Sequence, residues 1–64
     1  MKLFIEIEME NDAFHDERGE IGRLLNELAS VAYHESIKSY HGKGDQLLRD
    51  SNNEVCGKWY VLET

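Results

Sequence analysis

The side chains of this 64-residue chain that could do chemistry begin with one cysteine, Cys56, and three histidines, His15, His34 and His41. Thiolate and imidazole serve both nucleophilic catalysis and zinc binding, but their spacing here matches no known zinc-ligand signature. His34 and His41 are seven residues apart, which on one helix is about 10 Å along the axis and too far to share an ion. We therefore expect no metal site and no cofactor.

Two carboxylates, Glu6 and Glu8, are the next candidates because alternate residues of a strand share one face. Paired carboxylates do acid–base work when a cleft separates their pKa values, and an open sheet face offers no cleft. Gly42 and Gly44 follow a predicted helix instead of beginning one, so they do not form a phosphate-binding loop. These patterns predict that the protein is not an enzyme.

Charge is the strongest functional signal in the sequence. The chain carries 13 acidic and 7 basic residues, for a net charge of −6, and the first twenty residues hold seven acidic residues against Lys2 and Arg18. Binding to nucleic acid or to an anionic membrane begins with Lys and Arg neutralising phosphate. We therefore expect neither direct nucleic-acid binding nor membrane binding, and instead attraction to a basic protein surface.

No apolar stretch is long enough to cross a bilayer, and no charged-then-apolar signal pattern opens the chain. A single cysteine cannot form an internal disulfide, which agrees with a reducing compartment. The expected location is the cytoplasm.

The stretch "KLFIEIEMEN" alternates apolar and polar residues and predicts a half-buried strand. Its inner face would hold Leu3, Ile5, Ile7 and Met9, and its outer face Phe4, Glu6, Glu8 and Glu10, with carboxylates roughly 7 Å apart. The simpler interpretation is a solvated face that discourages edge pairing. The functional one is a negatively charged recognition strip, in which the aromatic Phe4 is typical of binding patches.

A helix is predicted from about Asp16 to the glycines at 42 and 44, which can end it. One side of the helix would be apolar and would dock on the sheet, with the polar side opposite. The apolar residues are Ile21, Leu24, Leu25, Leu28, Val31 and Ala32, and the polar ones Arg23, Glu27, Ser30 and His34. Near its end, Tyr33, Ile37 and Tyr40 either form an exposed apolar patch or cover the end of the hairpin.

The C-terminal part predicts a hairpin, with a strand from about Gln46 to Asp50 and a final strand over 55–62. Asn52 and Asn53 could take the two positive-φ positions of a type I′ turn. That turn puts Leu48 opposite Gly57 and Gln46 opposite Trp59.

Gly57 either leaves room for the helix or marks a bulge. Without a bulge Val55, Trp59 and Val61 face inward and Cys56 faces outward. With a bulge Cys56 joins the core.

These elements predict one α+β domain over residues 1–64, a three-stranded antiparallel sheet with one amphipathic helix on one face, in the order βαββ. The last strand should lie between the other two, because it can then pair antiparallel with both. Trp59 should anchor the core beneath Leu25 and Leu28.

Three stretches, "IEIEMENDAF", "EIGRLLNELA" and "LLRDSNNEVCGKW", together resemble a group of short phage and prophage proteins. The resemblance covers about residues 3–59 and implies a βαββ fold and a viral origin. The chain differs from the group in having Asn53 and Glu54 where Gly-Asn is usual, and in a longer "YHESIKSYHGKG" segment. The group has no common activity to carry over to any residue. By analogy of size and origin, small acidic phage proteins are often inhibitors of host machinery, anti-CRISPR proteins among them.

The sequence therefore predicts a small protein that binds and inhibits a host protein with a basic, nucleic-acid-binding surface. The expected contact residues are Phe4, Glu6, Glu8, Glu10, Tyr33, Ile37 and Tyr40. The alternative is a non-catalytic structural or regulatory subunit that works as a homo-oligomer, such as a homodimer.

Overall fold

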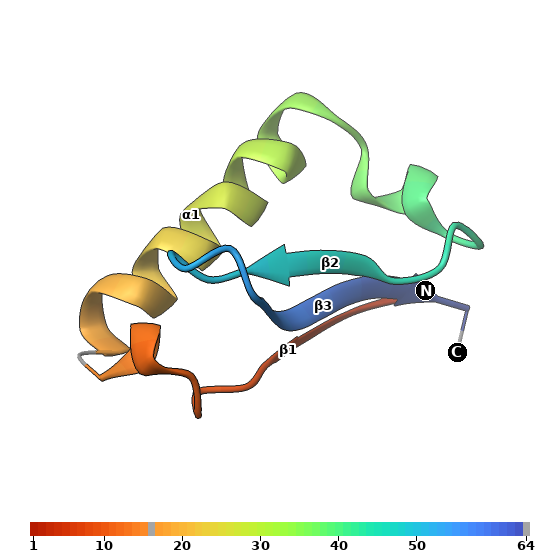
Figure 1. Ribbon diagram of the computed structural model, residues 1–64. Helices are drawn as coiled ribbons and strands as arrows, with labels where there is room; N and C mark the ends of the chain where they lie inside the picture. Colours follow the sequence, from red (N-terminus) through yellow and green to blue (C-terminus); the bar gives the residue numbers. More distant parts are fainter. Residues whose placement is uncertain (16, 64) are drawn as a thin grey trace.

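A computed structural model describes residues 1–15 and 17–63 of the chain. Its elements follow in the order β1 (Lys2–Ile7), η1 (Asp12–Phe14), α1 (Glu17–His34), η2 (Ile37–Tyr40), β2 (Gln46–Arg49) and β3 (Val55–Leu62), where η denotes a 3-10 helix. The three strands form one antiparallel sheet in the order β1-β3-β2, and α1 lies on one side of it (Figure 1). The predicted α+β class, the βαββ order and the central position of the last strand are confirmed.

The pairing of β1 with β3 confirms the predicted alternation of faces from Leu3 to Ile7, but three of the predicted inner residues, Leu3, Ile5 and Met9, are exposed. Ile5 lies opposite Trp59 on the helix side of the sheet, and Glu6 lies opposite Lys58 on the other side. The strand is shorter than expected, because β1 ends at Ile7. The Glu8 amide still donates to the carbonyl of Cys56 at 2.6 Å, but β3 begins at residue 55 and leaves the chain beyond Glu8 without a strand partner.

The predicted end of the helix was wrong. α1 ends at His34, and the expected start at residue 16 lies outside the described residues. After α1 the chain turns back to the sheet through η2 (Figure 1), so that the Tyr40 ring meets the Trp59 ring edge-on at 4.7 Å. Packing of an aromatic pair outweighs continuation of a helix that would project into solvent.

The core lies between α1 and the strands β2 and β3. Its buried apolar residues are Phe14, Leu24, Leu28, Leu48, Cys56, Trp59 and Val61. Trp59 is 5% exposed, as predicted for a core anchor. Leu28 belongs to the same cluster, whereas Leu25 is 45% exposed and does not cover Trp59 as expected. The helix leaves β1 largely uncovered, and Leu3 and Ile5 are 44% and 41% exposed on the helix side of that strand.

The hairpin turn differs from the predicted type I′ turn. Asn53 has a φ of 64° and is the only non-glycine residue with positive φ in the described part of the chain. A type I′ turn would need a positive φ at Asn52 as well. The Asn53 amide donates to the Asp50 carbonyl at 2.9 Å, and the Asp50 amide donates to the Glu54 carbonyl at 2.8 Å. This is the three-residue hairpin loop, a tight turn followed by one left-handed residue.

A β-bulge decides the orientation that the sequence left open at Cys56. The register of β2 and β3 runs from Gln46 opposite Trp59 to Leu48 opposite Gly57, as predicted, and then shifts so that Arg49 lies opposite Val55. Cys56 is the extra residue, and its side chain is 2% exposed. Bulges re-aim side chains in this way, so Cys56 joins the core and Val55 turns outward.

Candidate binding face

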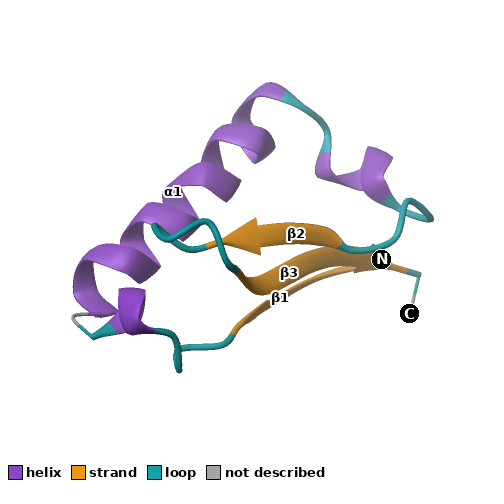
Figure 2. Cartoon of the chain, viewed as in Figure 1, coloured by secondary structure: helices purple, strands orange, loops and turns teal. Residues whose placement is uncertain are grey.

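One face of the sheet is left open. Figure 2 shows α1 and η2 on the same side of the three strands, and no helix covers the opposite side in the described part of the chain. We call this opposite side the outer face. The registers place on it the side chains of Lys2, Phe4, Glu6, Leu47, Lys58, Tyr60 and Leu62. A sheet face that exposes aromatic and aliphatic side chains is typical of an interaction surface.

The centre of the outer face is an aromatic stack. Phe4 and Tyr60 lie opposite each other in the β1–β3 register, and their rings are stacked with centroids 5.2 Å apart and planes 11° apart. The ammonium group of Lys58 sits 5.5 Å from the centre of the Tyr60 ring, within range of a cation–π contact. The stack gives the face a rigid apolar centre with two half-buried rings.

Polar groups surround this stack and partly neutralise one another. The Tyr60 hydroxyl donates to Oε1 of Glu6 at 3.3 Å, and Nζ of Lys58 lies 3.2 Å from Asp45 and 4.0 Å from Glu6. The hydrogen bond to Asp45 raises the pKa of Lys58. Burial, followed by the charge of Glu6, raises the pKa of Tyr60. The charge of Glu6 is therefore shared with Lys58 and is not fully available to a partner.

A shallow hollow of about 650 Å³ opens beside the bulge at the end of the outer face. Glu6 and Glu8 line it on the β1 side, Leu47 and Val55 supply apolar walls, and Lys58 borders it. The hollow could accept an aliphatic side chain that carries a positive charge at its end, because its apolar and acidic walls match the two parts of such a side chain.

The predicted row of three carboxylates is not a straight strip along a strand. Glu8 and Glu10 lie beyond the end of β1, in the segment that leads to η1. Asn11 in this segment donates from Nδ2 to Asp50 in the hairpin turn at 2.8 Å, so the segment over 8–12 lies beside the turn. Glu8 and Glu10 make no ion pair within the described residues, and both are exposed. The unneutralised negative charge is therefore displaced from the sheet centre to this end of the molecule.

The three residues of the expected apolar patch do not come together. Tyr33 lies on α1 and is 88% exposed. Within the described residues its ring contacts one other ring, that of His34, in a T-shaped arrangement with the ring centres 5.4 Å apart. Ile37 and Tyr40 pack instead against the core, and the Tyr40 hydroxyl donates to Glu35 at 3.1 Å. Of the two alternatives, packing against the sheet is the one that the structure shows for Ile37 and Tyr40.

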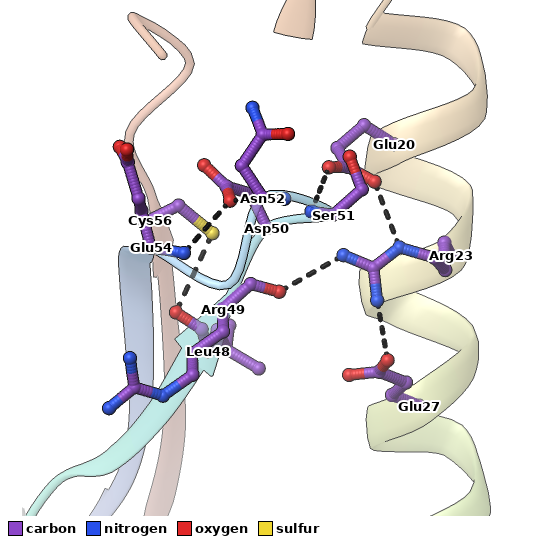
Figure 3. Close-up of polar contacts among 10 residues, drawn as sticks. All are labelled: Glu20, Arg23, Glu27, Leu48, Arg49, Asp50, Ser51, Asn52, Glu54 and Cys56. Carbon is purple, nitrogen blue, oxygen red and sulfur yellow. Dashed lines mark hydrogen bonds and ion pairs between the residues drawn. The ribbon is translucent and has the colours of Figure 1, made fainter. Parts of the chain in front are cut away.

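Sequence reasoning missed a buried polar cluster that joins α1 to the hairpin turn (Figure 3). Glu20 is 6% exposed and accepts hydrogen bonds from Nε of Arg23 at 2.9 Å and from the Ser51 amide at 2.7 Å. Arg23 also donates from Nη2 to the carbonyl of Arg49 at 3.0 Å. The helical wheel placed Arg23 opposite the apolar side and did not predict these contacts; the side chain is 37% exposed, and its guanidinium reaches the edge of β2.

The second buried carboxylate of this cluster is Asp50, which is 4% exposed. Its Oδ1 accepts from the amides of Asn52 at 2.9 Å and Glu54 at 3.0 Å, and Asn11 supplies a third donor. The Asn11 hydrogen bond, with the two amides, lowers the pKa of Asp50. The Arg23 hydrogen bond does the same to the pKa of Glu20. Every acceptor is occupied from within the chain, so this cluster stabilises the turn and is not an open site. The signal available in the sequence was Asp50 itself, because a short polar residue directly before a turn often accepts hydrogen bonds from the backbone of that turn.

Within the described residues, no group of three or more His, Cys, Asp and Glu side chains is arranged to hold a metal ion. The same residues include no helix long and apolar enough to cross a membrane. Comparison of the chain with protein-family models, with curated proteins and with solved structures found no match.

Proposed function

We propose that this protein is a stoichiometric, non-catalytic binding protein that docks on a basic surface of another protein and blocks it. For a phage-encoded chain the target would be a host protein whose basic surface holds nucleic acid, as for inhibitors of the anti-CRISPR kind. The observation that carries the proposal is the open sheet face, on which the Phe4–Tyr60 stack adjoins the acidic hollow and the free carboxylates of Glu8 and Glu10.

The two parts of this surface have different roles in the proposed complex. Glu8 and Glu10 steer association with Arg and Lys of the target, because exposed charges act mainly on the association rate. The apolar centre around Phe4 gives the complex its lifetime, because a buried aromatic anchor contributes most of the affinity in many interfaces. Glu6, which already faces Lys58, contributes less than the sequence alone suggested.

The test begins with capture of the target from host-cell lysate and continues with purified proteins. We expect Glu8→Lys with Glu10→Lys to slow association and to reduce its salt dependence, because the steering charge is lost. Phe4→Ala should instead speed dissociation and weaken binding by about 2 kcal/mol or more. Both effects are measured by surface plasmon resonance over a range of salt concentrations.

The matched control is Glu35→Lys with Glu63→Lys, which makes the same change in net charge. Both residues are exposed; Glu35 lies between α1 and η2, and Glu63 follows β3. If the control slows association as much as the Glu8 and Glu10 variant does, net charge alone is responsible and the proposed surface is wrong. Circular dichroism of each variant verifies that the fold is retained.

A further inference from the structure

In the part of the chain that the structure describes, the free edge of β1 has neither a bulge nor a covering side chain, whereas the opposite edge of the sheet has both. β2 is four residues long and ends at the bulge, and Arg23 of α1 donates to the Arg49 carbonyl at 3.0 Å. Short length, a bulge and a covering side chain are three of the usual protections of an edge strand, and charged side chains, which β1 has in Lys2 and Glu6, are a fourth. β1 has six regular residues with no bulge against β3, and no hydrogen bond from a described side chain covers its backbone.

The backbone groups that β1 offers at this edge follow from its pairing with β3. The Glu8 amide donates to the Cys56 carbonyl, which continues the register that pairs Glu6 with Lys58. Hydrogen-bonded and non-hydrogen-bonded pairs alternate in an antiparallel ladder, so the even-numbered residues of β1 point their backbone groups to β3. The amides and carbonyls of Leu3, Ile5 and Ile7 therefore point to the free edge.

We propose that a second copy of this chain pairs with that edge, with the two β1 strands antiparallel about a two-fold axis at Phe4. The sequence of β1 is complementary to itself in this register. The Lys2 of each copy lies opposite Glu6 of the other copy, and the Leu3 of each copy lies opposite Ile5 of the other. Opposite charges and apolar side chains are favourable cross-strand neighbours. Because Leu3 and Ile5 form the hydrogen-bonded pairs, the backbone and side-chain requirements agree.

Both faces of the joined sheet gain contacts. On the outer face, Phe4 lies opposite Phe4 of the second copy in a non-hydrogen-bonded pair, where side chains are closest, and this extends the stack that each Phe4 makes with Tyr60. On the helix side, Leu3 and Ile5 are exposed in the single chain. In the dimer, Leu3 of each copy packs beside Ile5 of the other copy.

The neighbouring registers are less favourable. An axis at Ile5 places Glu6 opposite Phe4, so that Glu6 has no basic neighbour, and places Lys2 opposite residue 8, which lies beyond β1. An axis at Leu3 places Lys2 opposite Phe4 and leaves Glu6 without a basic neighbour on the second copy. Only the axis at Phe4 places both charged residues of β1, Lys2 and Glu6, opposite a residue of opposite charge within the strand.

The proposal does not depend on the partner binding proposed above, and its test uses the purified chain alone. Sedimentation over a range of concentrations should show a monomer–dimer equilibrium. Lys2→Glu alone and Glu6→Lys alone should each weaken the dimer about tenfold, because each brings two like-charged pairs together. An equimolar mixture of the two variants should recover the affinity, since every pair in the mixed dimer is then opposite in charge.

A matched control is Leu47→Lys compared with Leu3→Lys, because both leucines are exposed but Leu47 lies on β2. We expect Leu3→Lys to abolish the dimer and Leu47→Lys to leave it unchanged. Amide hydrogen exchange should show protection of Leu3 and Ile5 that rises with protein concentration, while Phe4 and Glu6 are protected at all concentrations. A chain that stays monomeric, a mixture that does not recover, or a dimer with unprotected Leu3 and Ile5 amides would overturn the proposal.

Discussion

Gly57 of β3 passes so close to β1 that a methyl group on its Cα would overlap the backbone oxygen of Glu6 and would lie 3.0 Å from the Cα of Ile7. The neighbours are backbone atoms, which cannot move aside without opening the sheet. We therefore expect Gly57→Ala to lower the free energy of unfolding by about 3 kcal/mol, the upper part of the range for overpacking. Urea denaturation measures this change.

The chain offers a control for that substitution in Gly22, which lies within α1 with no atom within 4 Å of an added Cβ. Gly22→Ala should raise the free energy of unfolding by about 1 kcal/mol, because alanine has the higher helix propensity. If Gly57→Ala proved as stable as the unmodified protein, the close approach of β3 to β1 would be wrong.

Trp59 connects β3 to both η2 and α1, since it meets Tyr40 edge-on and belongs to the core that includes Leu28. Trp59→Ala should cost about 3–5 kcal/mol, as expected for removal of a large buried aromatic, and a domain of this size would largely unfold. Tyr33→Ala, at a highly exposed position of α1, should change stability by less than about 0.5 kcal/mol. Thermal melting followed by circular dichroism compares the two, and equal melting temperatures would place Trp59 outside the core.

The buried carboxylates predict loss of stability in acid. Hydrogen bonds from Asn11 and from Arg23 lower the pKa of Asp50 and of Glu20 in the folded chain. A group with a lowered folded pKa contributes stability above its unfolded pKa, and this contribution is lost as the pH falls through the folded pKa. Stability should therefore be level near neutral pH and should fall below about pH 4, the ordinary range of carboxyl groups.

Asp50→Asn tests the origin of this effect. The amide can still accept from the turn, but its NH₂ group would face the Nδ2 donor of Asn11, so the variant should be less stable at neutral pH. It should also lose less stability than the unmodified protein between neutral and acid pH. Chemical denaturation at a series of pH values measures both. An unchanged acid profile would assign the pH dependence to other carboxyl groups.

Cys56 should be an unreactive thiol in the folded protein. Its side chain is almost fully buried, its Sγ lies 3.6 Å from the Leu48 carbonyl, and burial raises its pKa. Since the thiolate is the reactive form, a thiol reagent should label Cys56 slowly in buffer and rapidly in denaturant. Labelling in buffer at the rate of an unfolded chain would contradict the bulge that turns Cys56 inward.

Local rules of sequence predicted much of the fold. The alternation from Leu3 to Ile7 and from Lys58 to Leu62 set the two faces of the sheet. The hairpin of β2 and β3 was predicted as well, although Leu48 comes opposite Gly57 through a three-residue loop followed by a bulge and not through the predicted two-residue turn. Each of these features depends on residues that are near in sequence or on the period of two in a strand. For the same reason the sequence identified Phe4 and Glu6 as neighbours on the outer face.

The features that the sequence left open or predicted wrongly depend on contacts between distant residues. α1 ends at His34 because Tyr40 packs on Trp59, and Cys56 turns inward because the hairpin contains a bulge. Both choices depend on how well a side chain fills space in the finished core, which local propensity does not contain.

The same division holds for charge. The sequence by itself determined how many carboxylates the chain has and that most of the net charge lies in its first twenty residues. Only the tertiary structure decided that Asp50 is enclosed by donors from Asn11 and the turn, while Glu8 and Glu10 remain exposed. A carboxylate is available to a partner only if the fold brings no donor to it, and those donors come from segments that meet only when the chain has folded.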